Sequence, residues 1–349
     1  MSESSAQQNK PEQGGPATRS DQGGKAGVPI VLTDLTKRYP GQPKAAVDKV
    51  SMHIPAGEIV VFVGPSGCGK TTTMRMINRM IEPTSGTIEI GGEDVTKLND
   101  VHLRRRIGYV IQQIGLIPHL SIAQNVALVP KLLKWDKKRV TARVDEMLTV
   151  VGLDPEQYRH RYPRQLSGGQ QQRVGVARAL AADPEIMLMD EPFGAVDPIT
   201  RSRLQDEFLS LQQTLKKTIV FVTHDFDEAL KLGDRIAVLR EGSEIAQFDT
   251  PEAILANPAD DFVEGFIGEG AALKRLNFER VDSLALDPAP EQSRGSVDVS
   301  TTLHAALDLM VGKGLRSITV DRDGRPVGSI SIDAILNRVN ATGADAVEA

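Results

Sequence analysis

A glycine-rich segment followed by a lysine and three threonines is the clearest place for chemistry in this sequence. It has the spacing G-x-x-x-x-G-K-[ST], follows an apolar run at residues 59–63 and precedes a stretch with helical apolar spacing. Glycines let the backbone wrap closely around an oxyanion, so that successive N–H groups converge on its oxygens. The segment therefore predicts a phosphate-binding loop. Its predicted cofactor-binding residues are Gly64, Pro65, Ser66, Gly67, Cys68, Gly69, Lys70, Thr71 and Thr72.

Two residues of this loop have specific predicted roles toward ATP and Mg²⁺. Lys70 is expected to reach the β- and γ-phosphates, and the Thr71 hydroxyl is expected to ligate the metal ion. An ordinary glycine-rich turn is the alternative, which the preceding strand and the following helix disfavour. Cys68 could be a reactive thiol, but the chain has one cysteine and hence no internal redox partner. We expect only its backbone N–H to matter.

Polar side chains follow two further apolar runs, each the length of a strand. Asp190 and Glu191 end the run that begins at residue 186, and His224 follows the run at residues 219–222. Asp190 suits coordination of Mg²⁺, while Glu191 is placed to orient and deprotonate an attacking water. His224 is expected near the γ-phosphate with a catalytic role. The alternatives are two ordinary surface acids and a structural histidine.

The elements that must position these groups form an α/β pattern. Strand, turn and helix recur in order, which predicts a parallel sheet as the core. Between residues 112 and 182 the pattern changes to amphipathic helices, which predicts a helical insertion. Short strands broken by a Pro-Gly pair precede the phosphate loop. After residue 296 a separate βαββα unit is predicted.

Composition limits the classes of function. The 349 residues suggest about two domains at roughly 150 residues each, with 40% hydrophobic and 25% charged residues. A net charge of -5 argues against a basic nucleic-acid-binding surface, so no nucleic-acid partner is expected. No run approaches the ~18 apolar residues of a membrane-spanning helix, and the first residues lack the apolar stretch of a secretory signal. Any role at a membrane would therefore depend on a partner chain.

The segment LSGGQ at residues 166–170 resembles the signature motif of the ABC (ATP-binding cassette) ATPases. It lies about twenty residues before Asp190, which is the order and spacing of that family. Further elements of the family pattern are Tyr39, Gln112, Asp197 and His224, in that order. The resemblance covers residues 28–268. It implies a P-loop NTPase cassette with a parallel-sheet core, an antiparallel β subdomain and a helical insertion.

The family pattern also implies how the remaining residues act. In the family, the signature of one subunit closes over the ATP held by a second copy, so Ser167, Gly168, Gly169 and Gln170 are expected to bind nucleotide across a homodimer. Tyr39 would stack on adenine. Gln112 would sense Mg²⁺ and water and signal to the helical insertion, and Asp197 would contact the partner cassette. A membrane permease that grips this insertion would convert closure into movement.

Stretches around residues 107–119 and 191–201 resemble the subfamily that imports glycine betaine, choline, carnitine and related osmoprotectants. Residues 299–339 resemble one CBS (cystathionine β-synthase type) motif, which such ATPases often carry as a sensor. The position expected for a ribose-binding acid holds Ala334, with Asp333 one residue early. Nucleotide binding and dimerisation are therefore both open for this unit, and two half-modules from two chains could form one site.

These patterns together divide the chain and its function. The predicted parts are a disordered tail at 1–27, the cassette at 28–268 with its helical subdomain at 112–182, a linker at 269–296, a CBS-like unit at 297–340 and a disordered tail at 341–349. The predicted function is ATP hydrolysis that drives an osmoprotectant importer at the cytoplasmic face of the membrane, with a permease and, indirectly, a substrate-binding protein. Alternatives are an importer of another small solute such as an amino acid, a soluble non-transport ABC ATPase, and a nucleotide sensor without turnover. Glu191 and His224 disfavour the last.

Overall fold

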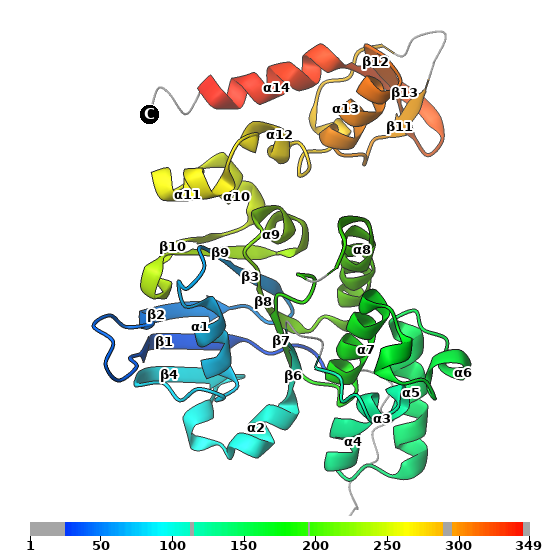
Figure 1. The fold of residues 1–349 in the computed structure, drawn as a ribbon. Coiled ribbons are helices and arrows are strands. Elements are labelled where there is room, and N and C mark those ends of the chain that lie inside the picture. The colour runs from blue at the N-terminus through cyan, green and yellow to red at the C-terminus, as the bar shows by residue number, and fades with distance from the viewer. Residues whose placement is uncertain (1–24, 112–114, 195, 289–294, 345–349) are drawn as a thin grey trace, which may run out of the picture.

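The computed structural model describes residues 25–111, 115–194, 196–288 and 295–344, with side chains described as far as residue 339 (Figure 1). Its central sheet has six strands in the order β10-β9-β3-β8-β7-β6, of which all but β10 run parallel. Its members are β3 (Ile59–Val63), β6 (Ile107–Val110), β7 (Ile186–Asp190), β8 (Thr218–Val222), β9 (Arg235–Leu239) and β10 (Ile245–Asp249). Every residue of β3, β7 and β8 is buried, as continuous apolar runs covered on both faces require.

A second, antiparallel sheet packs over helix α1 (Lys70–Ile77) from the other side. Its strand order is β2-β1-β4-β5, formed by β1 (Ile30–Lys37), β2 (Val47–Ile54), β4 (Ser85–Ile90) and β5 (Glu93–Asp94). Met74, Met76 and Ile77 of α1 belong to one buried cluster with residues of both sheets. The helix after the phosphate loop is therefore held between two sheets (Figure 1).

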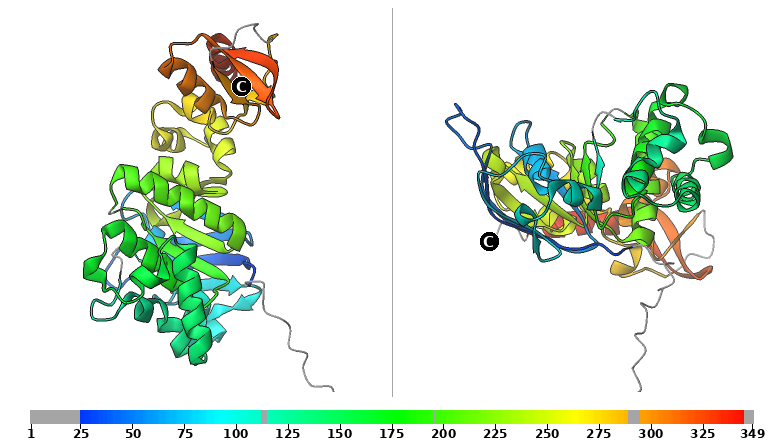
Figure 2. Two further views of the ribbon diagram at one scale, coloured as in Figure 1. Left: turned by 90° about the vertical axis from the view of Figure 1, so that its right-hand side faces the viewer. Right: turned by 90° about the horizontal axis from the view of Figure 1, so that it is seen from below.

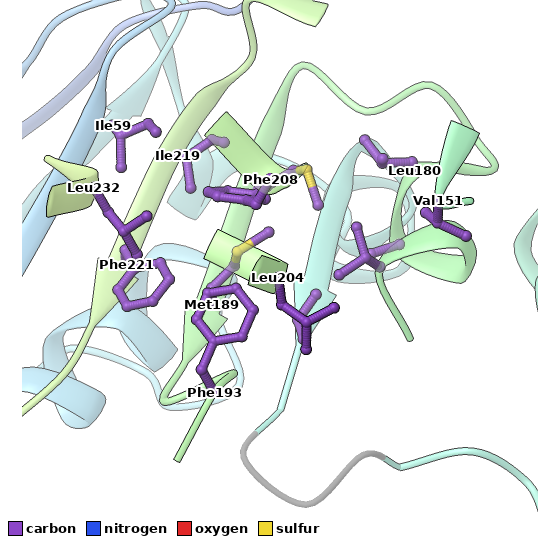
Figure 3. Packing of buried hydrophobic residues seen from close by; sticks show 14 of the residues in the cluster. Ile59, Val151, Leu180, Met189, Phe193, Leu204, Phe208, Ile219, Phe221 and Leu232 are labelled. Atoms are coloured by element: carbon purple, nitrogen blue, oxygen red, sulfur yellow. The ribbon is translucent and has the colours of Figure 1, made fainter. Parts of the chain in front are cut away.

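A group of helices lies beside the β6 edge of the central sheet, where α7 packs against β6 (Figure 1). It consists of α3 (Ile122–Val126), α4 (Leu128–Leu132), α5 (Lys137–Val150), α6 (Pro155–Tyr158) and α7 (Gly168–Leu180). Helix α8 (Pro198–Leu215) packs between these helices and the sheet, and α9 (Phe226–Leu232) follows β8. Figure 3 shows side chains of this cluster, with Leu204 and Phe208 of α8 facing Met189 and Phe221 of the sheet. Helix α2 (Asp100–Arg106) precedes β6.

The C-terminal unit has its own core and lies at one end of the cassette (Figure 2). Its elements are β11 (Ser296–Asp298), α13 (Leu303–Gly312), β12 (Ser317–Arg322), β13 (Arg325–Ser331) and α14 (Ile332–Ala344), which is the βαββα order that we predicted. Three short helices connect it to the sheet, namely α10 (Pro251–Ala256), α11 (Asp261–Ile267) and α12 (Ala271–Arg275). The predicted fold class, an α/β cassette with a small α+β unit, is confirmed.

The segment predicted as a linker, residues 269–296, differs from that prediction over much of its described length. It contains α12, and Leu276 and Val281 are buried in the core of the C-terminal unit. Asp287 exchanges two backbone hydrogen bonds of 2.9 and 2.8 Å with Ser329 of β13. Leu284 and Leu286 also pack against this core, so this stretch belongs to the unit that it leads into.

The ends of the chain were predicted to be disordered. Residues 1–24 and 345–349 lie outside the described residues. Residues 341–344 continue α14 as a helix, so the unit extends beyond the predicted end at residue 340. Over the described part of the chain, no helix has the length and apolar character needed to span a bilayer.

Candidate active site

The phosphate loop, residues 64–71, lies between the end of β3 and the start of α1, beside a cavity of about 260 Å³. Its lining brings together most of the residues predicted to do chemistry. They are Ser66, Gly67, Gly69, Lys70, Thr71, Thr72, Glu191 and His224, with Ala46 added. The carboxyl ends of neighbouring parallel strands meet at one edge of a sheet, which is why residues so far apart in sequence converge here.

The loop conformation depends on its glycines and on Lys70. Gly64, Gly67 and Gly69 have φ values of +150°, +81° and +112°, in a region that other residues rarely adopt. The Lys70 ammonium group donates hydrogen bonds of 2.7 Å to the Gly64 carbonyl and 2.9 Å to the Pro65 carbonyl. Lys70 is buried, so its charge lies inside the curve of the loop.

Thr71, which lines the cavity, forms a pair of oxygen groups with Asp190 at the end of β7. The Thr71 hydroxyl donates to Asp190 Oδ1 over 2.9 Å, and Arg75 Nη2 lies 3.7 Å from Asp190 Oδ2. Burial raises the pKa of Asp190, while the Thr71 hydrogen bond and the Arg75 charge counteract that rise. A hydroxyl and one carboxylate are hard oxygen ligands of the kind that Mg²⁺ uses together with phosphate oxygens and water.

Glu191 and His224 face one another on neighbouring strand ends. Glu191 Oε1 lies 3.2 Å from His224 Nδ1, and the histidine side chain is 67% exposed. Glu191 has φ +44°, a conformation that costs a residue with a side chain on the order of 1–3 kcal/mol. Strain of this size persists where packing holds the backbone in place. The turn after Glu191 is held by Phe193, whose ring contacts those of Phe208 and Phe221 at centroid distances of 6.3 and 6.0 Å (Figure 3).

The signature turn, residues 166–170, lies outside this cavity at the start of α7. Ser167 Oγ accepts a hydrogen bond from Gln170 N at 3.3 Å, and Gln170 Oε1 accepts one from Ser167 N at 3.0 Å. This reciprocal pair is a capping box, which starts the helix from within the chain. Ser167 and Gly168 are exposed. None of the predicted signature residues lines the phosphate-loop cavity.

Tyr39 and Asp197 also lie apart from the cavity lining, as do Gly64, Pro65, Cys68 and Asp190. Tyr39 follows β1, and Lys37 Nζ lies 5.2 Å from the centroid of its ring. Asp197 is exposed and caps α8, with its Oδ1 accepting from Thr200 N at 3.0 Å. Gln112 lies outside the described residues.

Sequence reasoning missed two contributors to the site. Ala46 lines the cavity from the turn before β2 and carries no sequence signal. Arg75, which faces Asp190, could have been found because it lies four residues after Thr71 and therefore on the same face of α1. A larger cavity of about 730 Å³ lies between α5, α7 and α8. Its lining is mainly apolar and contains none of the predicted site residues, so we place the chemistry at the smaller cavity.

Comparison with known proteins agrees with this geometry. Residues 47–194 match the family model described as ABC transporter, and residues 295–341 match the model of the CBS domain. The chain resembles the dimeric post-hydrolysis structure of the ATP-binding cassette MJ0796 bound to ADP and Pi. That resemblance has a TM-score of 0.57 and 36% identity, and covers 64% of this chain and 98% of the other.

Curated relatives match over nearly the whole chain. The osmoprotectant import ATP-binding protein OsmV of Salmonella typhimurium is 52% identical over 86% of this chain and 78% of its own length. The glycine betaine/carnitine/choline transport ATP-binding protein OpuCA of Bacillus subtilis is 53% identical over 90% and 81%. The glycine betaine uptake system ATP-binding protein YehX of Escherichia coli is 44% identical over 88% and 99%. The chain therefore belongs to the ABC transporter family and is an ATPase subunit of the group that contains the osmoprotectant importers.

Proposed function

We propose that this chain binds and hydrolyses ATP as a homodimer, and that it thereby drives import of a quaternary amine or related osmoprotectant through a membrane permease. The observation that carries the catalytic part is the 3.2 Å approach of Glu191 to His224 within the cavity that the phosphate loop also lines. The relatives' names, which refer to glycine betaine, choline and carnitine, support the class of solute.

The residues in the cavity and next to it have separate roles in phosphoryl transfer. The loop N–H groups and Lys70 bind and neutralise the phosphates. Thr71 and Asp190 would hold Mg²⁺, which when bound neutralises charge on the phosphate oxygens. Glu191 accepts a proton from the attacking water, and His224 holds that carboxylate in position. A cassette with this arrangement relies on positioning and electrostatics rather than on covalent intermediates.

The second copy supplies what one chain lacks. Ser167 and Gly168 of the signature turn are exposed and lie apart from the chain's own cavity, so this capped helix start is accessible to an ATP held by another cassette. The MJ0796 cassette, which this chain resembles, is a dimer in its solved structures. We infer that this chain pairs in the same way, and that it sits at the cytoplasmic face of the membrane by binding the permease, which also meets a substrate-binding protein.

The test is purification of the full chain with its permease, followed by ATPase assay in lipid with the solute-binding protein and candidate solutes. Stimulation by glycine betaine, choline or carnitine is the expected result. Stimulation by an amino acid or another small solute instead would change the solute class and leave the importer role. ATP hydrolysis by the chain without a permease partner and without any response to solutes would favour a soluble ABC ATPase.

A further inference from the structure

The turn that joins β9 and β10, residues 240–244, lies against the back of the phosphate loop. Ser243 at its centre is fully buried, with 0% exposure. Its backbone N–H donates to the Cys68 carbonyl over 2.6 Å, and its hydroxyl lies 3.2 Å from the same oxygen. Ser243 Oγ is also 3.1 Å from Thr73 Oγ1 on α1. One residue, 175 positions away in sequence, therefore joins the loop to the helix that follows it.

The fit between this turn and the loop is close on both sides. A Cβ atom on Gly69 would lie 2.2 Å from Ser243 Oγ, and one on Gly64 would lie 2.2 Å from the Leu239 carbonyl oxygen at the end of β9. Neither distance is possible for real atoms. These two loop glycines are thus needed for contact with the β9–β10 turn as well as for their own positive φ values.

Ser243 itself adopts a strained conformation to make these contacts. Its φ is +58°, in the left-handed region that residues with a side chain seldom occupy. Gly242 precedes it with φ +78°, and the Arg240 N–H closes the turn by donating to the Glu244 carbonyl over 2.8 Å. Strained residues persist where the surroundings hold them, and they cluster at functional sites.

The anchored carbonyl determines where the next N–H group points. The Cys68–Gly69 peptide is trans, so its C=O and N–H groups point in opposite directions. Two donors from Ser243 hold the Cys68 oxygen at the back of the loop. The Gly69 N–H therefore faces the other side, where Gly69 lines the cavity. This orientation is the one that binding of a phosphate oxygen requires.

We propose that Ser243 is a positioning residue for nucleotide binding, which anchors the Cys68–Gly69 peptide so that its N–H group faces the phosphates. The inference rests on the proposed function, since it takes the loop to be the ATP site. Ser243 does not line the cavity and acts only through the loop. Its loss should weaken ATP binding and raise KM for ATP, with little change in kcat, because Glu191 and His224 are untouched.

The experiment uses the full chain, with Cys68 as a built-in reporter. Cys68 is the chain's only cysteine and is 2% exposed, so its rate of reaction with a thiol reagent measures opening of the loop. Ser243→Ala should raise that rate without nucleotide and should increase Kd for ATP by about 3- to 10-fold, as expected for one net hydrogen bond. Thr73→Val, which keeps the Ser243–Cys68 bond, should have a smaller effect on both.

Two further variants control for folding. Ser243→Gly removes the same hydroxyl while relieving the positive φ, so it serves if Ser243→Ala is unstable. Ser283→Ala deletes a serine that donates to the Arg280 carbonyl over 2.6 Å in the C-terminal unit, and it should behave as wild type in both assays. Thermal melts establish that each variant is folded.

The outcomes separate this inference from the proposed function. Wild-type labelling rates and wild-type ATP affinity in both Ser243 variants would overturn the anchoring role and leave the ATP site intact. A fall in kcat at unchanged KM would also overturn it, because a loop anchor should act on binding. Failure of the wild-type chain to bind ATP would count against the proposed function. The labelling comparison is made without nucleotide and would still decide whether Ser243 anchors the loop.

Discussion

The phosphate loop and the signature turn are both glycine-containing segments that precede a helix. The phosphate loop lines a cavity formed within its own chain, whereas the signature turn lies outside that cavity. The phosphate loop is held from behind by the β9–β10 turn, and a buried lysine lies within its curve. Its helix starts at Gly69, which has no side chain to cap the first N–H groups. The signature turn caps its own helix through Ser167 and Gln170 and is exposed. In the dimer that we propose, the phosphate loop binds ATP within its own chain, and the signature turn completes the site of the other chain.

The difference indicates where rigidity is needed. A loop that binds three phosphates must present N–H groups before the ligand arrives, so contacts within the chain hold it in shape. In the dimer that we propose, the signature turn reaches a ligand held by another subunit, so it needs a stable helix start and an open face. Gln170 Nε2 donates to the Tyr158 hydroxyl over 3.0 Å, which further fixes the turn without covering it.

The largest effect on hydrolysis should come from Glu191→Gln in the phosphate-loop cavity. The isosteric amide cannot accept a proton, so hydrolysis should fall by about 10²- to 10⁴-fold while ATP binding is kept. Single-turnover hydrolysis and ATP titration of the full chain measure the two properties. Glu89→Gln, on the exposed face of β4, is the matched control. Turnover at the wild-type rate would remove Glu191 from the role of base.

Gly168→Asp should impair the function of the signature turn without affecting the phosphate loop. A Cβ at Gly168 meets nothing within 4 Å, so the variant should fold, and the new charge would face the phosphates of the partner's ATP. Like charges brought together at an interface cost several kcal/mol, so hydrolysis should fall by about 10²-fold. ATP binding to the separate chain should not change.

Gly265→Asp on α11, where a Cβ also has open space, should leave hydrolysis unaffected and controls for the added charge. The decisive measurement is a mixture of Gly168→Asp with Glu191→Gln. In a mixed dimer both defects fall on the same composite site, which leaves the other site with wild-type residues. Partial recovery of hydrolysis on mixing is expected. Its absence, with both variants folded and paired, would contradict a composite site.

Lys70→Ala tests the contribution of the phosphate loop to ATP binding. A hydrogen bond to a charged group contributes on the order of 1.5–3 kcal/mol, so Kd for ATP should rise by about 10- to 100-fold. Equilibrium titration with a fluorescent ATP analogue measures the change. Lys97→Ala, at an exposed lysine paired with Asp94, is the matched control. Normal affinity of the Lys70 variant would refute the assignment of the phosphate loop.

The same contrast explains what could be read from the sequence. Lys70 and Thr71 follow β3, Asp190 and Glu191 lie at the end of β7, and His224 follows β8. Parallel strands place such residues together, so local pattern was enough to predict one site, in which Asp190 lies beside the cavity that the other four line. The role of Ser243 depends on a contact across 175 positions and on a positive φ that no local pattern signals. Tertiary contact alone reveals it.

The segment before the C-terminal unit was misread for a related reason. Prolines, aspartates and serines between residues 282 and 296 indicated a linker, which was predicted to span residues 269–296. Leu276 and Val281 nevertheless complete a core whose other members come from α13, β12 and β13. Isolated apolar residues carry no periodicity from which burial could be predicted. Their burial depends on the surface that the rest of the unit offers.

The smallest predicted effect is a pH-dependent change in the stability of the folded chain, caused by a residue near the phosphate-loop cavity. Glu228 on α9, four residues after His224, is 7% exposed and accepts a hydrogen bond of 3.0 Å from Gln205. Burial raises its pKa above the ordinary value of 4.5, and hydrogen bonds from Thr223 and Gln205 only partly offset the rise. The folded chain therefore binds this proton more tightly than the unfolded chain does. Stability is greatest below pH 4.5 for this group and falls as pH rises from there through the folded pKa.

Glu228→Gln removes the free-energy cost of ionising a buried carboxyl group, because the amide does not ionise. Its melting temperature relative to wild type should rise as pH increases from about 4.5 through the folded pKa of Glu228 and then level off, with the Gln205 contact kept by the amide. Glu264→Gln, on the exposed side of α11, should show no such trend. A variant whose relative stability falls as pH rises would mean that the Glu228 carboxylate is stabilised in the folded chain. In that case a charge interaction of Glu228 would stabilise α9 beside the phosphate-loop site, and the stability of the folded chain would depend on pH in the opposite direction.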